Sequence, residues 1–281
     1  METTTQERRP ESRFDRAIRE FGTWIAAGTH ERVVRSLDQI AADYGINRAM
    51  ARDICLILQA KGMVEMRPRI GVTVQSREKW GVFDRDVLRW RLDADYWTQL
   101  SALTDLRLTI EPHCARLAAN RATSPQQGSL RTLADRLGDI GTRWVTAGDA
   151  ATDADRNDYL DVDQQFHRGL LAASGTEMLR AVSPAIDLAL EARNENFARS
   201  RQSDVGAPPR AIALLLHTGV ATAIFQRRPD EADLCMTAIL HEVRGKLDQD
   251  VVRRLSTALA DLGMATPENL EILRAAGSET P

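Results

Sequence analysis

The stretch SLDQIAADYGINRAMARDICLILQAKGMV, residues 36–64, decides the fold of the front of this chain. Its first residues, Ser36–Gln39, are spaced as a capping box, in which the hydroxyl caps the first helical turn and the amide reaches back. Gly45 permits a sharp turn after this short helix. Asn47 is a good cap for a further helix, which Gly62 ends. The pattern therefore predicts two helices joined by a tight turn.

The flanking segments complete this pattern. Residues 14–27 predict an amphipathic helix whose apolar stripe is followed by Gly28. Residues 63–74 carry β-branched side chains around Pro68 and Gly71, which is typical of a short hairpin. Helix, tight turn, helix and hairpin form the layout of a winged helix-turn-helix, which binds DNA.

In that layout the helix after the turn enters the major groove, and its first residues meet base edges. Arg48 and Arg52 are four residues apart, so they share one face of this helix. Arg67 and Arg69 flank the proline of the hairpin and suit phosphate or minor-groove contact. The alternative interpretation is a solvated basic face with no ligand. The residues expected to contact DNA are Arg35, Asn47, Arg48, Arg52, Arg67 and Arg69.

Composition limits the remaining possibilities. The 281 residues are 43% hydrophobic, which suffices for two domains and excludes general disorder. A net charge of −3 excludes a basic coat over the whole protein but allows a local basic face. Three cysteines, Cys55, Cys114 and Cys235, lie far apart, so neither a disulfide framework nor a cysteine zinc site is expected. No run approaches the ~20 apolar residues of a membrane span, and the start of the chain is polar. We expect a cytoplasmic protein.

Helical spacing of apolar residues continues after the hairpin, so the fold class is mainly α with an all-helical back part. Thr266-Pro267 has the form of a cap and first-turn proline for a short last helix. The expected organisation is a winged helix-turn-helix in 1–75, a linker in 76–92, a helical domain in 93–250 and a helical extension with a tail in 251–281.

The front of the chain resembles the GntR superfamily of bacterial transcription regulators. The matching residues are Leu37–Ala41, Tyr44–Arg48, Ala51–Asp53, Leu58–Val64 and the wing Arg67–Gly71. The family's usual Leu-Pro-Ser-Glu run is replaced by Val34–Leu37, and its Arg-Glu-Ala-Leu run by Arg52–Cys55. The resemblance implies a DNA-binding regulator, which we expect to be a repressor. Because half-sites are normally paired by a two-fold axis, we also expect a homodimer.

The back of the chain, from about residue 93 to 245, resembles the FCD ligand-binding domain of the fatty-acid-regulator (FadR) branch of that superfamily. The matching stretches are Leu103–Pro112, Ala115–Thr123, Asp161–Leu170 and Ala172–Gly175. The resemblance implies that Arg107 binds the carboxylate of an effector, and we include Glu111 in this effector site. An internal ion pair of the two is the plainer interpretation of their spacing. The connector Trp80–Trp90 resembles that of regulators that sense aldonates and related sugar acids.

A metal site is the other expectation for this domain. Asp163 and His167 are four residues apart on a helix, so a carboxylate and an imidazole project from one face and can chelate a divalent ion such as zinc. The resemblance adds His217 as third ligand. The alternatives are a solvated acidic run, since six aspartates lie between residues 149 and 163, and a histidine satisfied by a backbone carbonyl.

The usual fourth ligand is missing from the position that the resemblance assigns to it. That position is Ile239, and His241 is displaced from it by two residues, ~200° around a helix. Cys235, one turn earlier, is a possible substitute. Otherwise the site has three protein ligands at best, and water or the effector must complete the shell.

Together these observations predict a ligand-responsive, DNA-binding regulator that responds to a small carboxylate, and not an enzyme. The rival hypothesis is a metal-dependent hydrolase or lyase that uses Asp163, His167 and His217, but no nucleophile motif or general base accompanies these residues. A third possibility is a regulator fold that serves only protein interaction.

Overall fold

Side-chain caps set the starts of both helices in the decisive stretch. The Ser36 hydroxyl accepts a hydrogen bond from the backbone N–H of Gln39. In return, the Gln39 side-chain oxygen accepts one from the backbone N–H of Ser36 at 2.8 Å. The Asn47 side chain accepts from the Met50 N–H at 2.8 Å. Gly45 has a φ of 62°, so the turn between the helices uses a backbone conformation that favours glycine. The expected helix-turn-helix is confirmed.

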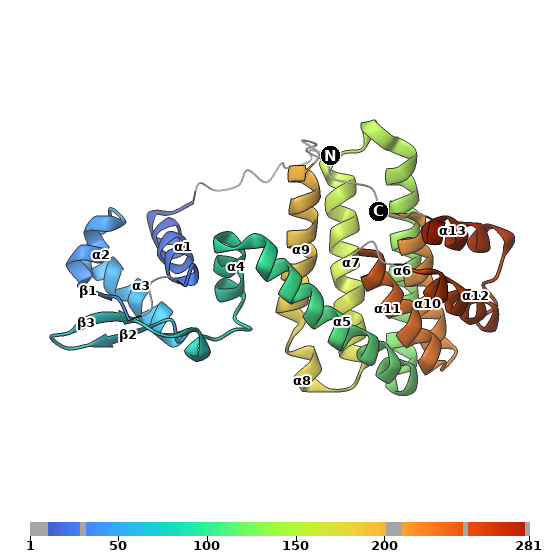
Figure 1. Ribbon diagram of the computed structural model, residues 1–281, viewed down its shortest axis with the longest axis horizontal. Coiled ribbons are helices and arrows are strands. Elements are labelled where there is room, and N and C mark those ends of the chain that lie inside the picture. Colours follow the sequence, from blue (N-terminus) through green and yellow to red (C-terminus); the bar gives the residue numbers. More distant parts are fainter. Residues whose placement is uncertain (1–10, 29–31, 201–209, 244–246, 279–281) are drawn as a thin grey trace. The chain divides into compact units, whose positions relative to one another are not determined.

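The computed structural model describes residues 11–28, 32–200, 210–243 and 247–278. The chain divides into two compact units, Met1–Gln99 and Leu100–Pro281, with their elements shown in Figure 1. The elements of the first unit are α1 (Arg13–Ala26), β1 (Val34–Arg35), α2 (Leu37–Asp43), α3 (Arg48–Ala60), β2 (Val64–Arg67), β3 (Gly71–Val74), η1 (Arg77–Lys79) and α4 (Arg85–Ala94).

The expected hairpin is the wing of the first unit. β2 and β3 pair antiparallel, with Val64 opposite Val74 and Arg67 opposite Gly71. β1 adds a third strand on the other side of β3. β1 has only two residues, and a strand this short shows no alternation of apolar and polar residues from which the sequence could predict it.

The expected linker is helical over much of its length. α4 begins inside the predicted linker, 76–92, and continues to Ala94, and its Val87 and Trp90 belong to the core of the first unit. The Trp90 ring packs directly on Gly22 of α1: a Cβ added at Gly22 would come within 2.3 Å of a ring carbon. The apolar residues of this segment therefore pack in the core of the first unit. The sequence predicted a linker here because the segment is otherwise polar.

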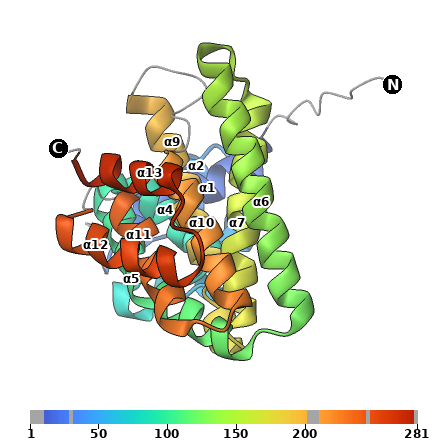
Figure 2. The same cartoon turned by 90° about the vertical axis from the view of Figure 1, so that its right-hand side faces the viewer.

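The second unit is a bundle of helices. Its elements are α5 (Tyr96–Arg121), α6 (Ser124–Ala147), η2 (Gly148–Ala150), α7 (Asp153–Ala173), α8 (Glu177–Arg180), α9 (Ser183–Ser200), α10 (Ala211–Phe225), α11 (Pro229–Val243), α12 (Gln249–Asp261) and α13 (Pro267–Ser278). α10 packs against α6 and α11, and α7 packs against α6 and α9 (Figure 2). α10 is apolar around most of its circumference, as expected of a helix enclosed by others.

Side-chain caps begin two helices of the second unit, α7 and α13. Thr152 caps α7 in a capping box with Asp155, so most of the aspartate run is helical and not a loop. The Thr266 hydroxyl accepts from the Asn269 N–H at 3.2 Å, as expected of the cap of the last helix.

α12 and α13 contribute Leu255, Leu273 and other residues to the bundle core. No described helix is long and apolar enough to cross a membrane.

The contact between α1 and α4 gives a test of this packing. We expect Gly22→Ala to lower the free energy of unfolding by ~1–3 kcal/mol, because the new methyl group overlaps the buried Trp90 ring. Gly138→Ala in α6 is the control: nothing lies within 4 Å of an added Cβ there, so we expect a gain of ~0.5–1 kcal/mol from helix propensity. Thermal and urea denaturation measure both. Equal stability of the Gly22→Ala variant and the original protein would contradict the packing.

Candidate nucleic-acid interface and metal centre

A cleft on the first unit brings the expected DNA-contacting residues together. It lies between the start of α2, the exposed side of α3 and the wing. Its lining residues include Ser36, Asp38, Arg48, Arg52, Gln59, Arg67, Arg69 and Ile70. Arg35 and Asn47 do not line it. Arg48, Arg52, Arg67 and Arg69 thus gather basic side chains of the kind that contact duplex DNA on one side of the first unit.

Three of the arginines have carboxylate partners at the surface. Arg48 pairs with Asp38, and Arg67 Nε lies 2.8 Å from Glu65 Oε1. Arg35 pairs with Asp43. Exposed ion pairs of this kind contribute only ~0–1 kcal/mol, so phosphate or base contacts can replace them at little cost.

Arg52, Arg69 and Asn47 complete the set. Arg52 forms no ion pair among the described residues. Arg69 has a φ of 65° at the tip of the wing, where the Ile70 N–H donates to the Arg67 carbonyl at 3.2 Å. A left-handed conformation at a non-glycine residue costs stability, and such positions cluster at ligand-binding sites. The Asn47 carbonyl oxygen is used in capping, so only its amide N–H groups remain for DNA.

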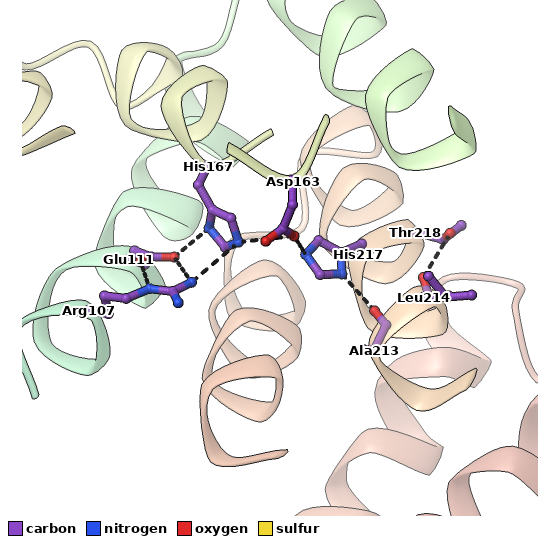
Figure 3. Close-up of polar contacts among 8 residues, drawn as sticks. All are labelled: Arg107, Glu111, Asp163, His167, Ala213, Leu214, His217 and Thr218. Atoms are coloured by element: carbon purple, nitrogen blue, oxygen red, sulfur yellow. Dashed lines mark hydrogen bonds and ion pairs between the residues drawn. The ribbon is translucent and has the colours of Figure 1, made fainter. Parts of the chain in front are cut away.

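The second unit holds a cluster of charged and imidazole side chains in its interior (Figure 3). Arg107 and Glu111 come from α5, Asp163 and His167 from α7, and His217 from α10. None of the five residues is more than 3% exposed. Burial of so many polar groups is costly unless they pair, so their contacts define the site.

Glu111 stands between an arginine and a histidine. Arg107 Nε donates to Glu111 Oε1 at 2.6 Å, and Arg107 Nη2 lies 3.4 Å from Glu111 Oε2. The same Oε2 is 2.6 Å from His167 Nδ1. The expected internal pair of Arg107 and Glu111 therefore exists, and Glu111 also contacts a residue on another helix. Spacing in the sequence carries no signal of the contact with His167, because α5 and α7 are far apart in the chain.

His217 presents one nitrogen to Asp163. Its Nδ1 lies 2.7 Å from the Ala213 carbonyl oxygen, so this nitrogen carries the proton. The other nitrogen, Nε2, is then a lone pair, and it lies 3.2 Å from Asp163 Oδ1. His217 Nε2 is buried without a hydrogen-bond partner among the described residues. Two acceptor atoms that face each other at this distance require a cation between them or an added proton.

These atoms fit a divalent cation. One ligand atom from each of Asp163, His167 and His217 lies within 4.8 Å of the others. Two imidazoles and a carboxylate form a donor set that suits zinc and similar ions. The contact of His217 with Ala213 and that of His167 with Glu111 would orient the two rings toward the ion.

Both carboxylates are ionised in this environment. Burial alone raises the pKa of Asp163, but the neighbouring His217 and His167 outweigh it, so the pKa lies well below its usual range. Burial also raises the pKa of Glu111, and Arg107 and His167 more than compensate, which again lowers the pKa. The site thus keeps two negative charges and one arginine.

The structure adds no protein ligand at the position of the missing fourth one. Ile239 is 2% exposed and belongs to the bundle core. Neither His241 nor Cys235 belongs to the group of close ligand atoms found among the described residues. The Cys235 thiol packs against Gly219, and burial raises its pKa to about 12, so it is a neutral core residue.

Comparisons with known proteins identify the family of the second unit. The family model of the FCD domain matches residues 102–242, half of the chain. The galactonate operon transcriptional repressor of Escherichia coli K12 is 28% identical over 196 residues, which cover 69% of this chain and 78% of the repressor. The uncharacterized HTH-type transcriptional regulator YieP of the same strain is 25% identical over 203 residues, 72% of this chain and 80% of YieP.

Among solved structures, GntR of Streptococcus agalactiae is similar with a TM-score of 0.43 and 23% identity, over 83% of this chain and 100% of that chain. Both Escherichia coli relatives are named as transcription regulators. The two family resemblances, the mainly α fold and the regulator hypothesis are confirmed. The chain belongs to the FCD-domain family, and like these relatives it is a transcriptional regulator.

Proposed function

We propose that this regulator binds operator DNA through α3 and the wing, and that a small carboxylate bound in the helical unit modulates this binding. The observation that carries the proposal is the buried cluster, in which Arg107 lies beside three residues able to hold a metal. An arginine and a partly coordinated divalent ion together attract an anion. A carboxylate is the simplest anion that both can bind.

The effector that fits this cluster best is an acid with a neighbouring hydroxyl group, as in a sugar acid. If a divalent ion is held by Asp163, His167 and His217, three protein ligands leave coordination positions for the effector. The bound ion would act as a Lewis acid that anchors the carboxylate and its hydroxyl group. The relative named for galactonate, together with the resemblance of Trp80–Trp90 to the connectors of aldonate sensors, supports this class of ligand.

We further propose a homodimer that acts as a repressor. A single recognition helix reads only a few base pairs, and two-fold symmetry pairs half-sites about one helical turn apart. The similarity to the galactonate operon repressor supports repression, because the name of that protein gives the sign of its regulation. A particle of ~31 kDa in sedimentation at micromolar concentration would contradict the dimer.

Substitution of single arginines tests the DNA interface. We expect Arg52→Ala to weaken binding by ~1–3 kcal/mol and to relax base preference, because a base-edge contact carries specificity. Arg67→Ala should weaken binding equally for all sequences and reduce the salt slope by about one, as loss of a phosphate contact does. Fluorescence anisotropy with the promoter fragment upstream of the protein's own gene measures both.

The matched control for these variants is Arg253→Ala in α12, whose exposed side chain pairs with Asp250 and lies outside the first unit. It should leave DNA affinity unchanged. If Arg52→Ala also left affinity and preference unchanged, the assignment of the α3 face would be wrong. If no fragment bound in a salt-sensitive way, the operator-binding proposal itself would fail.

A thermal-shift screen of sugar acids and other small carboxylates tests the effector site. A true effector at 100 times its Kd should stabilise the protein by ~2.7 kcal/mol. We expect Arg107→Ala to abolish this gain, since it removes the guanidinium fork that meets the carboxylate. Arg116→Ala, on the same helix and paired with Asp230 and Asp233 on α11, should retain the gain. Equal stabilisation of both variants by the best acid would contradict the role of Arg107.

A further inference from the structure

Arg107 contacts a metal-ligand candidate as well as its carboxylate partner. Its Nη2 lies 3.4 Å from His167 Nε2, while its Nε is held by Glu111 at 2.6 Å. The Arg107 side chain is 3% exposed, so water cannot replace either contact. The guanidinium therefore has one end fixed on its own helix and one end directed at a histidine of α7 (Figure 3).

The contacts of His167 assign its two nitrogens. Nδ1 lies 2.6 Å from Glu111 Oε2; the pair is not aligned as a hydrogen bond, but a carboxylate at this separation favours an N–H over a lone pair on the ring nitrogen. The lone pair of neutral His167 is therefore on Nε2. This nitrogen faces Arg107 on one side and Asp163 Oδ1, at 3.8 Å, on the other.

Arg107 and a metal ion thus need the same lone pair. A hydrogen bond from Nη2 to His167 Nε2 and a coordinate bond from that nitrogen to a divalent ion are alternatives, and the two cations also repel each other at this distance. Glu111 has the opposite influence, since its carboxylate orients His167 and raises the basicity of the ring.

We propose, on the basis of the function proposed above, that Arg107 competes with a divalent metal for His167 Nε2. When this nitrogen is coordinated, the guanidinium gives up the contact, keeps its bond to Glu111 through Nε, and turns Nη2 to an anionic effector. Arg107 is then a positioning residue for the metal site and the receptor of the effector. The two ligands assist each other: metal binding frees the guanidinium, and an effector that engages the guanidinium keeps it away from His167.

The competition predicts the direction in which metal affinity changes in each variant, so it can be tested with metal alone. We expect Arg107→Met to bind Zn²⁺ about tenfold more tightly than the original protein, the factor ordinarily associated with a hydrogen bond to a charged group. Glu111→Gln should bind Zn²⁺ ~10–100-fold more weakly, as loss of a carboxylate partner of a ligating histidine does. Arg116→Met, on the same helix but outside the cluster, should bind like the original protein. Competition of the full-length proteins with a chelating dye measures the affinities.

Opposite signs for two substitutions one turn apart separate this account from simple loss of structure, which can only weaken binding. Circular dichroism of each variant checks its folding, and Arg107→Gln serves if the Met variant does not fold. Weaker or unchanged Zn²⁺ binding in a folded Arg107 variant overturns the competition but leaves the proposed function in place. If the original protein binds no Zn²⁺ in the cluster, as judged by comparison with His217→Ala, both the competition and the metal part of the proposed function fail.

Discussion

The buried cluster of Arg107, Glu111, Asp163, His167 and His217 imposes a charge constraint on the whole helical unit. Arg107 neutralises Glu111, so the five residues carry a net charge of −1 when both histidines are neutral, and Arg193 interacts with Asp163 from outside the cluster. A net charge held in a core is costly. A divalent ion on Asp163 and the histidines would reverse the net charge to positive, and a bound carboxylate would then restore neutrality. The electrostatics thus favour a site that takes up a cation and an anion together.

Close packing of the surrounding bundle keeps the cluster residues from rearranging. α10 is apolar on nearly all sides and carries His217 at its centre, and the Phe166 ring packs edge-on against both His167 and His217 with centroid distances of 5.8 and 5.1 Å. Few rearrangements are open to these rings in a close-packed core. The arginines of the first unit differ in kind, because their carboxylate partners lie at the surface and yield easily to DNA. In the proposed function, buried pairs serve ligand sensing, and exposed pairs serve DNA contact.

Local signals in the sequence predicted the elements that depend on local chemistry. The capping box at Ser36, the cap at Asn47 and the hairpin around Pro68 all involve residues within a few positions of one another. The trio of Asp163, His167 and His217 needed more than spacing: the i, i+4 pair is visible on its own, whereas the third member came from family resemblance. The structure brings all three together.

The remaining features depend on contacts between distant segments. β1 forms only because β3 offers an edge, and α4 is fixed by the space that Gly22 leaves for Trp90. The contact of Glu111 with His167 joins two helices whose approach no local pattern encodes. The helical form of the aspartate run depends on the cap at Thr152, which the high charge of the run obscured.

Joint binding of a cation and an anion in the cluster can be tested by anomalous diffraction at the zinc edge, from crystals grown with Zn²⁺ and the acid that stabilises the protein best. We predict one strong peak at ~2.0–2.2 Å from His167 Nε2, His217 Nε2 and an Asp163 oxygen. We also predict that Arg107 Nη2 has left His167 and contacts the carboxylate of the acid. A peak elsewhere, or an acid bound while Arg107 keeps its hydrogen bond to His167, would contradict it.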